Sequence, residues 1–284
     1  MEIRQLKFSI IVVCLNPGEK LQETIDSIKG QTYCNYEIIV KDGLSTDGSV
    51  EALTPNDKIK IFREKDVSIY DAMNQAVGYA KGDYAIFLNC GDKFFHTKVL
   101  EEVMGHIHYF REQKPDEIPD ELSDKSPDIV YGNIYNDRIG SMIQSAPVIT
   151  PFTCYRNVPC HQTCFYSLRM FMERGYHTKY VVRGDYEHFL WCYFQKKANI
   201  ISIPVTVSSY EGGGFSETKE NRERSKREHH EIVALYLTKG QLFKFRTILF
   251  LSMAPLRKKI AESKQLSGLY NTCKKMIYKR KGIQ

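Results

Sequence analysis

The sequence lacks the short motifs that would assign its chemistry directly. No Gly-x-Gly-x-x-Gly run follows the first apolar segment, where Asn16-Pro17-Gly18 stands instead, which argues against a dinucleotide-dependent oxidoreductase. No P-loop sequence occurs either. The eight cysteines include no Cys-x-x-Cys pair, and several lie in apolar runs, as Cys14 does. This pattern indicates buried free thiols in a reducing compartment. Residues 160–164 (CHQTC) offer no second ligand pair at a usable spacing, so we do not expect zinc.

Long apolar runs are also missing. The longest fall short of the ~20 residues that a membrane span needs. The first apolar strand begins near residue 8 with no small-residue cleavage site before it, so we expect no signal peptide. These features predict a cytoplasmic protein that is soluble or peripheral at the cytoplasmic face of the inner membrane.

Positive charge is concentrated at the C-terminal end. Residues 241–284 contain eleven Lys or Arg and one acidic residue, a net charge of +10, whereas residues 1–240 carry −4. Aromatic and aliphatic residues are interleaved with these charges, as in an interfacial membrane helix. We therefore expect a helical basic tail that binds an anionic membrane surface. The alternative is a helical pair that is solvated or packed on the core, and no motif supports nucleic-acid binding.

The first hundred residues alternate predicted strands and helices. The strands cover residues 8–16, 36–43, 59–62 and 84–89, and their nearly continuous apolar character is typical of parallel strands buried on both faces. Helices between them indicate βαβ units. In such sheets ligands bind beyond the carboxyl ends of the strands. Several polar side chains lie there and should converge on one crevice: Asn16, Asp42, Glu64 and Asp92.

Three helix starts are expected in this part of the chain. Asn16 should cap the first helix, with Pro17 in its first position. The Leu44–Ser49 turn should open a second helix. Ser68 and Asp71 have the spacing of a capping box for a helix that runs to about Ala80.

The rest of the chain suggests a second half and a tail. Polar residues 111–127 should form a loop. Strands are expected over 127–136 and 199–210, a helix near 168–174 and another over 184–198, followed by a charged helix over 217–240. We predict a domain spanning 1–216, with a nucleotide-sugar-binding half (1–95) and an acceptor half (127–216), and a basic tail over 217–284.

Four motifs in this order resemble family 2 inverting glycosyltransferases of bacterial polysaccharide biosynthesis, of the colanic-acid, capsule or lipopolysaccharide type. They are IIVVCLN with the following run to YEIIVKDGLSTDGS, then REKDVSIYDAMNQAVGYAKGDYAIFLNCGD, then VPCHQTCFYS, and finally RGDYEHFLW. The resemblance covers about residues 8–215. It implies an α/β fold of the GT-A type: a Rossmann-like nucleotide-binding core with a mixed, mostly parallel sheet.

The resemblance also implies roles for residues of the N-terminal half. Asp42 would accept a hydrogen bond from the uracil N3–H, and a carboxylate suits that donor. Asp92 would bind Mn²⁺ or Mg²⁺ on the donor diphosphate. The family usually has two or three acids at this point, whereas this chain has Asn89-Cys90-Gly91-Asp92, which leaves metal dependence open. Further nucleotide-binding candidates are Leu15, Asn16, Glu64, Asp71, Asn74, Asn89, Cys90 and Gly91. Asp71 has the equal alternative of serving only as a capping residue.

The remaining candidates lie on the acceptor side. The family places its general base at the position of Asp185, and a carboxylate at a helix start, facing a crevice, suits the removal of a hydroxyl proton. Glu187 is the nearest rival, and a plain N-cap is the structural alternative for Asp185. His161 and Gln162 are expected to bind acceptor hydroxyls, although a lone histidine is often structural.

These observations predict a glycosyltransferase of the hexosyltransferase type. It would move a sugar from a nucleotide-sugar, with UDP as the expected nucleotide, to a glycan or a lipid-linked saccharide, with inversion. The short acid cluster at residues 89–92 leaves one alternative from another class, a nucleotide-sugar-binding protein without catalysis. An oxidoreductase is the least favoured alternative.

Overall fold

The computed structural model describes residues 5–113 and 126–251. The part of the predicted basic tail beyond residue 251 therefore lies outside the described residues. The strands are β1 (Phe8–Cys14), β2 (Tyr36–Asp42), β3 (Ile59–Arg63), β4 (Tyr84–Phe87), β5 (Lys93–Phe94), β6 (Ile129–Asn136), β7 (Ser141–Ile143), β8 (Cys164–Ser167) and β9 (Ile200–Tyr210). The helices are α1 (Lys20–Lys29), α2 (Ile69–Val77), α3 (Val99–Glu112), α4 (Pro151–Arg156), α5 (Leu168–Glu173), α6 (Gly184–Phe194), α7 (Lys219–Tyr236) and α8 (Lys239–Leu251), with short 3₁₀ turns η1 (His161–Thr163) and η2 (Phe215–Glu217).

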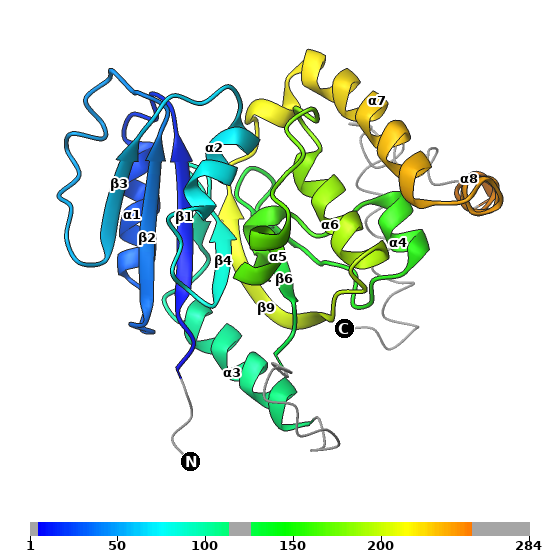
Figure 1. Ribbon diagram of the computed structural model, residues 1–284, viewed down its shortest axis with the longest axis horizontal. Helices are drawn as coiled ribbons and strands as arrows, with labels where there is room; N and C mark the ends of the chain where they lie inside the picture. The colour runs from blue at the N-terminus through cyan, green and yellow to red at the C-terminus, as the bar shows by residue number, and fades with distance from the viewer. Residues whose placement is uncertain (1–4, 114–125, 252–284) are drawn as a thin grey trace. The chain divides into compact units, whose positions relative to one another are not determined.

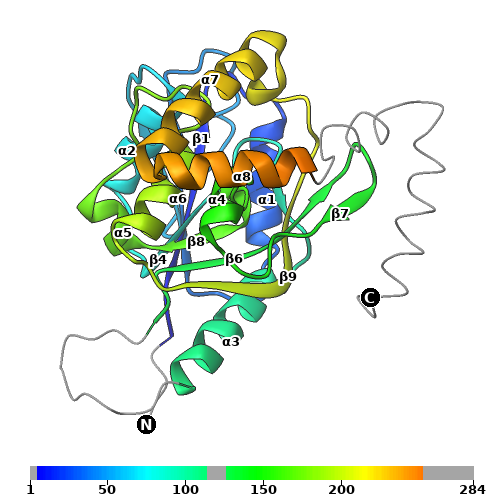
Figure 2. The ribbon, with the colours of Figure 1, turned by 90° about the vertical axis from the view of Figure 1, so that its right-hand side faces the viewer.

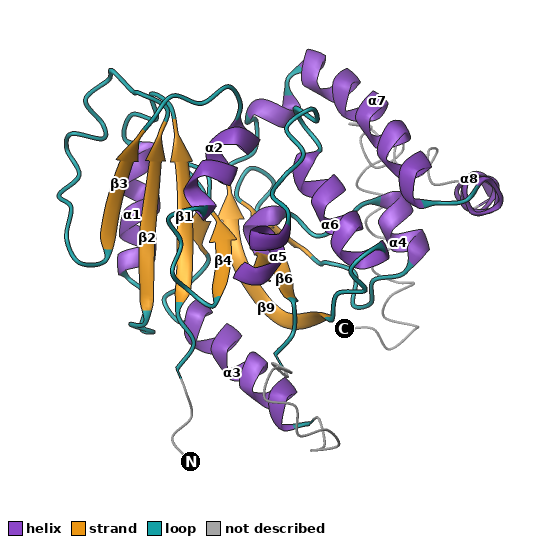
Figure 3. Ribbon diagram, in the orientation of Figure 1, coloured by secondary structure: helices purple, strands orange, loops and turns teal. Residues whose placement is uncertain are grey.

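The strands form one mixed sheet in the order β3-β2-β1-β4-β8-β6-β9-β5, with β7 paired to β6. Strands β1 to β4 are parallel, so their carboxyl ends lie at the same edge, where the arrowheads of Figure 3 point. Strand β8 runs antiparallel to both β4 and β6, which ends the parallel half. The mixed α/β fold predicted from the sequence is confirmed.

Alternation along the strands produces two apolar faces. Ile10 and Val12 of β1 pack in a core with Leu21 and Ile25 of α1 and with residues of α3. The alternate residues of β1, Ile11 and Val13, point to the opposite face of the sheet. On that face α2 packs against β1 and β2. Figures 1 and 2 show α1 and α2 on opposite sides of the sheet. Both faces of β1 and β2 are thus covered, which explains their continuous apolar runs.

Two predicted helix starts, at Asn16 and at the Leu44–Ser49 turn, are wrong. In both places a glycine with positive φ turns the chain away from a helical path. Asn16 and Gly18 have φ values of 48° and 59°, so the chain turns through left-handed conformations and α1 begins at Lys20. The predicted cap at Asn16 therefore does not form. Residues 43–58, all of them described, contain turns and no helix, and Gly48 there has φ 80°. The Leu44–Ser49 turn leads directly toward β3.

The start of α2 agrees with the sequence. Ser68 is the N-cap, and its side chain accepts a hydrogen bond from the N–H of Asp71. The Asp71 carboxylate in turn accepts from the N–H of Val67 at 2.9 Å. The helix ends at Val77 rather than near Ala80. The Ser68 half of the expected capping box is confirmed, whereas the Asp71 carboxylate binds the N–H of Val67, one residue before the expected Ser68. The contact of Asp71 with a nucleotide remains a separate hypothesis.

The chain divides into two compact units, residues 1–232 and 233–284. The first unit extends beyond residue 216, where we expected the domain to end. Its continuation is the first part of α7, which is held by Glu228: that carboxylate accepts hydrogen bonds from the N–H groups of Val181, Val182 and Arg183 at 2.9–3.0 Å.

Across the described ranges 5–113 and 126–251, no helix has both the length and the apolar character needed to span a bilayer.

Candidate active site

A cavity of about 580 Å³ lies at the edge of the sheet where β1 and β4 end. The turn after β4, the starts of α2 and α6, η1 and the segment after β9 all contribute to its walls. This is the position at which open α/β sheets bind ligands. Seven of the residues predicted from the sequence line it: Asn89, Cys90, Gly91, Asp92, His161, Gln162 and Asp185.

Asp185, the second residue of α6, has its carboxylate held by three groups. Its Oδ1 accepts hydrogen bonds from the Tyr70 hydroxyl (2.9 Å) and from the N–H of Tyr186 (2.8 Å), and its Oδ2 lies 3.0 Å from Nδ1 of His161. Gly184 permits this approach, because a Cβ there would lie 2.7 Å from the Tyr70 ring. The Asp185 side chain is 24% exposed and so can be reached from the cavity.

Opposing effects set the pKa of Asp185. Burial acts to raise it, but the hydrogen bond and charge of His161, together with hydrogen bonds from Tyr70 and the Tyr186 N–H, outweigh burial and hold the pKa below its usual value. The carboxylate is therefore ionised at neutral pH. Because Oδ2 accepts only from His161 among the described residues, it keeps a lone pair for a further donor.

His161 links Asp185 to the turn after β4. Its Nδ1 faces Asp185, and its Nε2 lies 3.1 Å from Nδ2 of Asn89. The nitrogen that faces the carboxylate is the one that can donate to it, so the ring orients Asp185 through Nδ1. The Asn89 Oδ1 is buried and makes no hydrogen bond with any part of the chain that the structure describes. An acceptor is thus left unsatisfied in the wall of the cavity.

Asp92 is nearly buried, with 7% of its surface exposed. Burial raises its pKa to about 6, against the lowering effects of the His161 charge, the Gln162 side chain and the Asn89 N–H. Mg²⁺ is commonly held by one or two carboxylates together with substrate phosphates and waters. Residues 5–113 and 126–251 contain no cluster of three or more His, Cys, Asp or Glu that could hold a metal alone. Asp92 fits a cation that is held mainly by a phosphorylated ligand.

Asp42 ends β2 but does not line the cavity. Its side chain is fully buried and accepts hydrogen bonds from the N–H and hydroxyl of Ser45 and from Nε of Arg63 at 3.0 Å. Arg63 is itself 41% exposed. In this arrangement Asp42 has no exposed surface, so a nucleotide could reach it only if Arg63 or Ser45 moved.

Four other predicted nucleotide contacts lie outside the cavity wall, three of them in loops and one in α2. Leu15 is 63% exposed. The N–H of Asn16 donates a hydrogen bond to the Ser45 hydroxyl, and the side-chain oxygen of Asn16 accepts one from the Thr46 N–H. Glu64 accepts a hydrogen bond from the Tyr79 hydroxyl. The remaining one is Asp71, at the start of α2. These residues follow β1 and β3 or begin α2, and they are not among the residues that form the cavity wall.

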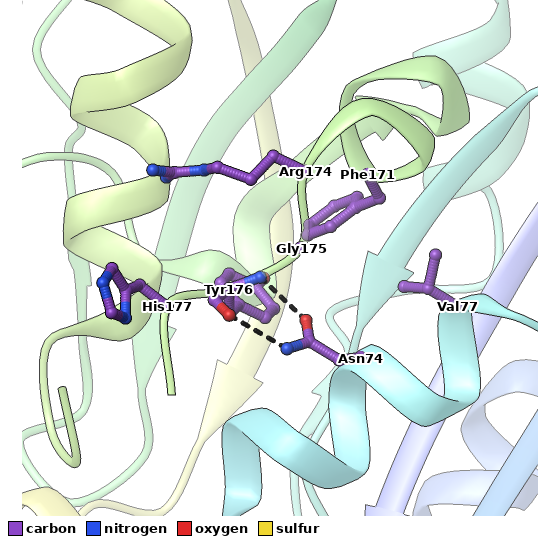
Figure 4. Close-up of a pocket in the computed structure, with 7 residues that line it drawn as sticks. All are labelled: Asn74, Val77, Phe171, Arg174, Gly175, Tyr176 and His177. Carbon is purple, nitrogen blue, oxygen red and sulfur yellow. Dashed lines mark hydrogen bonds between the residues drawn. The ribbon is translucent and has the colours of Figure 1, made fainter. Parts of the chain in front are cut away.

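Asn74 lies in a different cavity, of about 400 Å³, shown in Figure 4. Its side-chain amide pairs with the backbone of Tyr176, accepting from the N–H at 2.7 Å and donating to the carbonyl at 2.9 Å. Both polar ends of the side chain are thus used to join α2 to the loop after α5. Asn74 therefore acts as a structural link, and its polar atoms are engaged away from the candidate active site.

Glu187, the rival base, faces away from the cavity. Its side chain is 3% exposed and forms a two-pronged ion pair with Arg174, at 3.1 and 2.7 Å. Arg174 also lies over the Trp191 ring. Two positions along α6 turn Glu187 to the opposite side of the helix from Asp185, so these partners leave it a structural role.

Sequence reasoning missed several polar residues of the cavity, among them Lys20, Tyr70, Arg183 and Glu211. Tyr70 and Arg183 adjoin predicted residues and could have been found as neighbours of Asp71 and Asp185. Lys20 and Glu211 are joined by an ion pair across 191 positions of sequence. A local sequence pattern cannot predict an ion pair between residues so far apart in the chain.

Comparisons with known proteins identify related sequences. Residues 9–113 match the profile described as glycosyl transferase family 2. A PGL/p-HBAD biosynthesis glycosyltransferase from Mycobacterium bovis (strain BCG / Pasteur) is 31% identical over 227 residues, which cover 78% of this chain and 83% of the relative. An uncharacterized glycosyltransferase of Mycobacterium tuberculosis is 27% identical over 70% of this chain and 71% of its own.

Solved structures share the fold. S. aureus TarS (residues 1–349), determined in complex with UDP, has a TM-score of 0.63 at 17% identity, covering 86% of this chain and 72% of that one. The mannosyltransferase PcManGT from Pyrobaculum calidifontis, in complex with GDP-Man and Mn²⁺, has a TM-score of 0.55 at 15% identity, covering 96% and 81%. At these identities the likeness concerns the fold, which is the GT-A-like arrangement expected from the sequence.

Proposed function

The chain belongs to glycosyl transferase family 2, and from this we propose that it transfers a hexose from a UDP-sugar to a glycan or lipid-linked saccharide, with inversion. The observation that carries the proposal is the Asp185 carboxylate, ionised, reachable from the cavity and held by Tyr70 and His161. UDP and UDP-GlcNAc complexes of the structural neighbour TarS support the choice of nucleotide. The mycobacterial relative, named for PGL/p-HBAD biosynthesis, supports placing the enzyme in a biosynthetic role.

In this mechanism Asp185 is the general base. The acceptor hydroxyl donates to Oδ2, and its oxygen attacks the anomeric carbon from the face opposite the leaving diphosphate. The proton passes to Asp185 as the new glycosidic bond forms. His161 holds the carboxylate in place, and Gln162 would contact sugar hydroxyls on the acceptor side.

The leaving group would lie over the turn after β4. There Asp92 would hold Mn²⁺ or Mg²⁺, which would stabilise the negative charge that develops on the diphosphate. Asn89, Cys90 and Gly91 form the same turn and would contact the donor. The nucleotide base would then lie among the carboxyl ends of β1 to β3 and the loops that follow them, close to Leu15, Asn16, Asp42 and Glu64. Arg63 would have to move away from the Asp42 carboxylate for the base to reach it.

A screen of nucleotide sugars tests the donor. UDP- and GDP-sugars would be compared by thermal unfolding, with and without Mn²⁺. A ligand at a hundred times its dissociation constant stabilises the folded state by about 2.7 kcal/mol, so a true donor should raise the midpoint clearly. We expect UDP-sugars to stabilise more than GDP-sugars. Absence of any stabilisation by either class would contradict the proposal.

His161→Ala should shift the pH dependence of transfer. Removing this donor takes away a group that lowers the pKa of Asp185, so the folded carboxyl should protonate at higher pH. A single hydrogen bond corresponds to roughly one pKa unit. His161 lowers the pKa of Asp92 as well, so both carboxyls should protonate at higher pH, and we expect the acidic limb of the kcat/KM profile, measured from pH 3 to 8, to move upward by about one pH unit. The exposed His177 provides the control, because His177→Ala should leave the limb in place. An unmoved limb in His161→Ala would contradict the coupling.

Membrane association of the basic tail is part of the proposal, and it makes the cytoplasmic face of the inner membrane the expected location. Full-length protein should sediment with anionic vesicles at low salt and be partly released near 1 M salt, where the Debye length falls to ~3 Å. A chain ending at Lys239 should stay in the supernatant and still bind UDP. Full-length protein that ignores anionic vesicles, or a truncated chain that unfolds, would contradict the anchor.

A further inference from the structure

Lys20 is the first residue of α1 and reaches across the turn that carries Asp92. A Cβ added at Gly91 would lie 3.3 Å from Cδ of Lys20 and 3.9 Å from its Nζ. Gly91 has φ 97°, a conformation that favours glycine. The turn after β4 is therefore shaped so that the Lys20 side chain passes closely over it. This brings an ammonium group into the wall of the cavity.

Within the cavity, the ammonium group of Lys20 is bound by an acid. Its Nζ lies 2.6 Å from Oε2 of Glu211, which follows β9. Both side chains are about half exposed, at 54% and 49%. Exposed pairs of this kind contribute little to stability. The pair is thus weak enough for a more highly charged anion to replace the carboxylate.

The segment that carries Glu211 can adapt to such an exchange. Gly212 and Gly213, which follow it, have φ values of 76° and 77°. A glycine run of this kind has few steric limits on its backbone. Glu211 could move away from Lys20 without disturbing β9, which ends at Tyr210.

We propose that Lys20 binds the diphosphate of the nucleotide-sugar donor, and that the Glu211 carboxylate occupies the diphosphate's position beside Lys20 in the ligand-free protein. This assignment rests on the proposed function. The acid cluster after β4 is reduced to Asp92, so a cation there has one protein carboxylate. Lys20 adds a positive charge beside this turn, and a positive charge at the diphosphate stabilises the negative charge that develops there as the diphosphate leaves. Glu211 then acts as a competitor of the diphosphate for Lys20.

Competition predicts opposite effects for the two partners. Lys20→Met should weaken UDP binding by about tenfold or more, the scale of a lost charged hydrogen bond. Glu211→Gln should strengthen it by about two- to fivefold, because only a weak exposed pair is removed. Lys20→Arg should retain most of the affinity. The matched control is Lys179–Glu231, an ion pair of similar exposure (49% and 51%) whose residues do not line the cavity, and neither Lys179→Met nor Glu231→Gln should change binding.

The experiment is calorimetric titration of UDP and UMP into the full-length protein, in EDTA and in Mn²⁺. The loss in Lys20→Met should be larger for UDP than for UMP and should persist in EDTA, with circular dichroism unchanged. Equal UDP affinity in wild type and Lys20→Met, or an equal loss for UDP and UMP, overturns the role of Lys20. Weakened binding in Glu211→Gln overturns the competition. Failure of the wild type to bind any nucleoside diphosphate overturns the proposed function itself, and the Lys20 assignment with it.

Discussion

Asp185→Asn should lose transfer by about 10²–10⁴-fold or more, while binding of the nucleotide-sugar stays near that of the wild type. Asparagine keeps the shape of the side chain and can still accept from Tyr70 and the Tyr186 N–H. It cannot take a proton from the acceptor hydroxyl. Because the base acts on the acceptor, the donor site at the turn after β4 should be unaffected. Rates would come from product formation and affinities from calorimetry with UDP.

Glu187→Gln is the informative comparison. The Glu187 carboxylate is buried and pairs with Arg174, which is 32% exposed, so loss of this charged hydrogen-bonded pair should cost about 1–3 kcal/mol of stability. We expect that variant to unfold at lower temperature but, when folded, to keep much of its transfer activity per molecule. The reverse outcome, near-normal transfer in Asp185→Asn with loss in Glu187→Gln, would move the general base to Glu187.

Asp92→Asn should abolish the part of donor affinity that depends on Mn²⁺. Asp92 is the one carboxylate in the turn after β4, and an amide is a much weaker ligand for a hard cation. Affinity in EDTA should change little. The measurement is titration of a UDP-sugar with and without Mn²⁺, and metal-assisted affinity that is unchanged in the variant would contradict the assignment.

The same substitution should not destabilise the ligand-free protein. The pKa of Asp92 is raised to about 6, above an unfolded value near 3.9, so the folded state binds the proton more tightly. Stability contributed by this group is then present below about pH 4 and is lost as the pH rises through 6, a difference of about 3 kcal/mol. Thermal unfolding at pH 7 should show Asp92→Asn at least as stable as the wild type.

The strands and the location of the cavity followed from the sequence because they depend on local patterns. Apolar runs such as 8–16 predict buried parallel strands, and parallel strands necessarily bring their carboxyl ends to one edge. The capping of α2 by Ser68 depends on residues three positions apart. In each case the residues that determine the structure lie within a few positions of one another, so the local sequence is enough to predict it.

Side-chain partners could not be predicted in this way. Asp42 is at the predicted strand end, yet its carboxylate is enclosed by Arg63 from the neighbouring strand, and only the packing of β2 against β3 decides that. Asn74 looked like a ligand residue on a helix face but joins the backbone of Tyr176, 102 positions away. The first helix began at Lys20 instead of after Asn16, because Asn16 adopts a left-handed conformation that its sequence permits without requiring.

Inverting transfer from a UDP-sugar at the cavity of Asp185 is tested most directly by proton NMR. The spectrum would follow the sugar that the full-length protein releases to water from an α-linked UDP-hexose in the presence of Mn²⁺. Slow hydrolysis should yield the β-anomer first, before mutarotation, and Asp185→Asn should abolish it. Release of the α-anomer, or no consumption of any UDP-sugar with or without saccharide acceptors, would contradict the account.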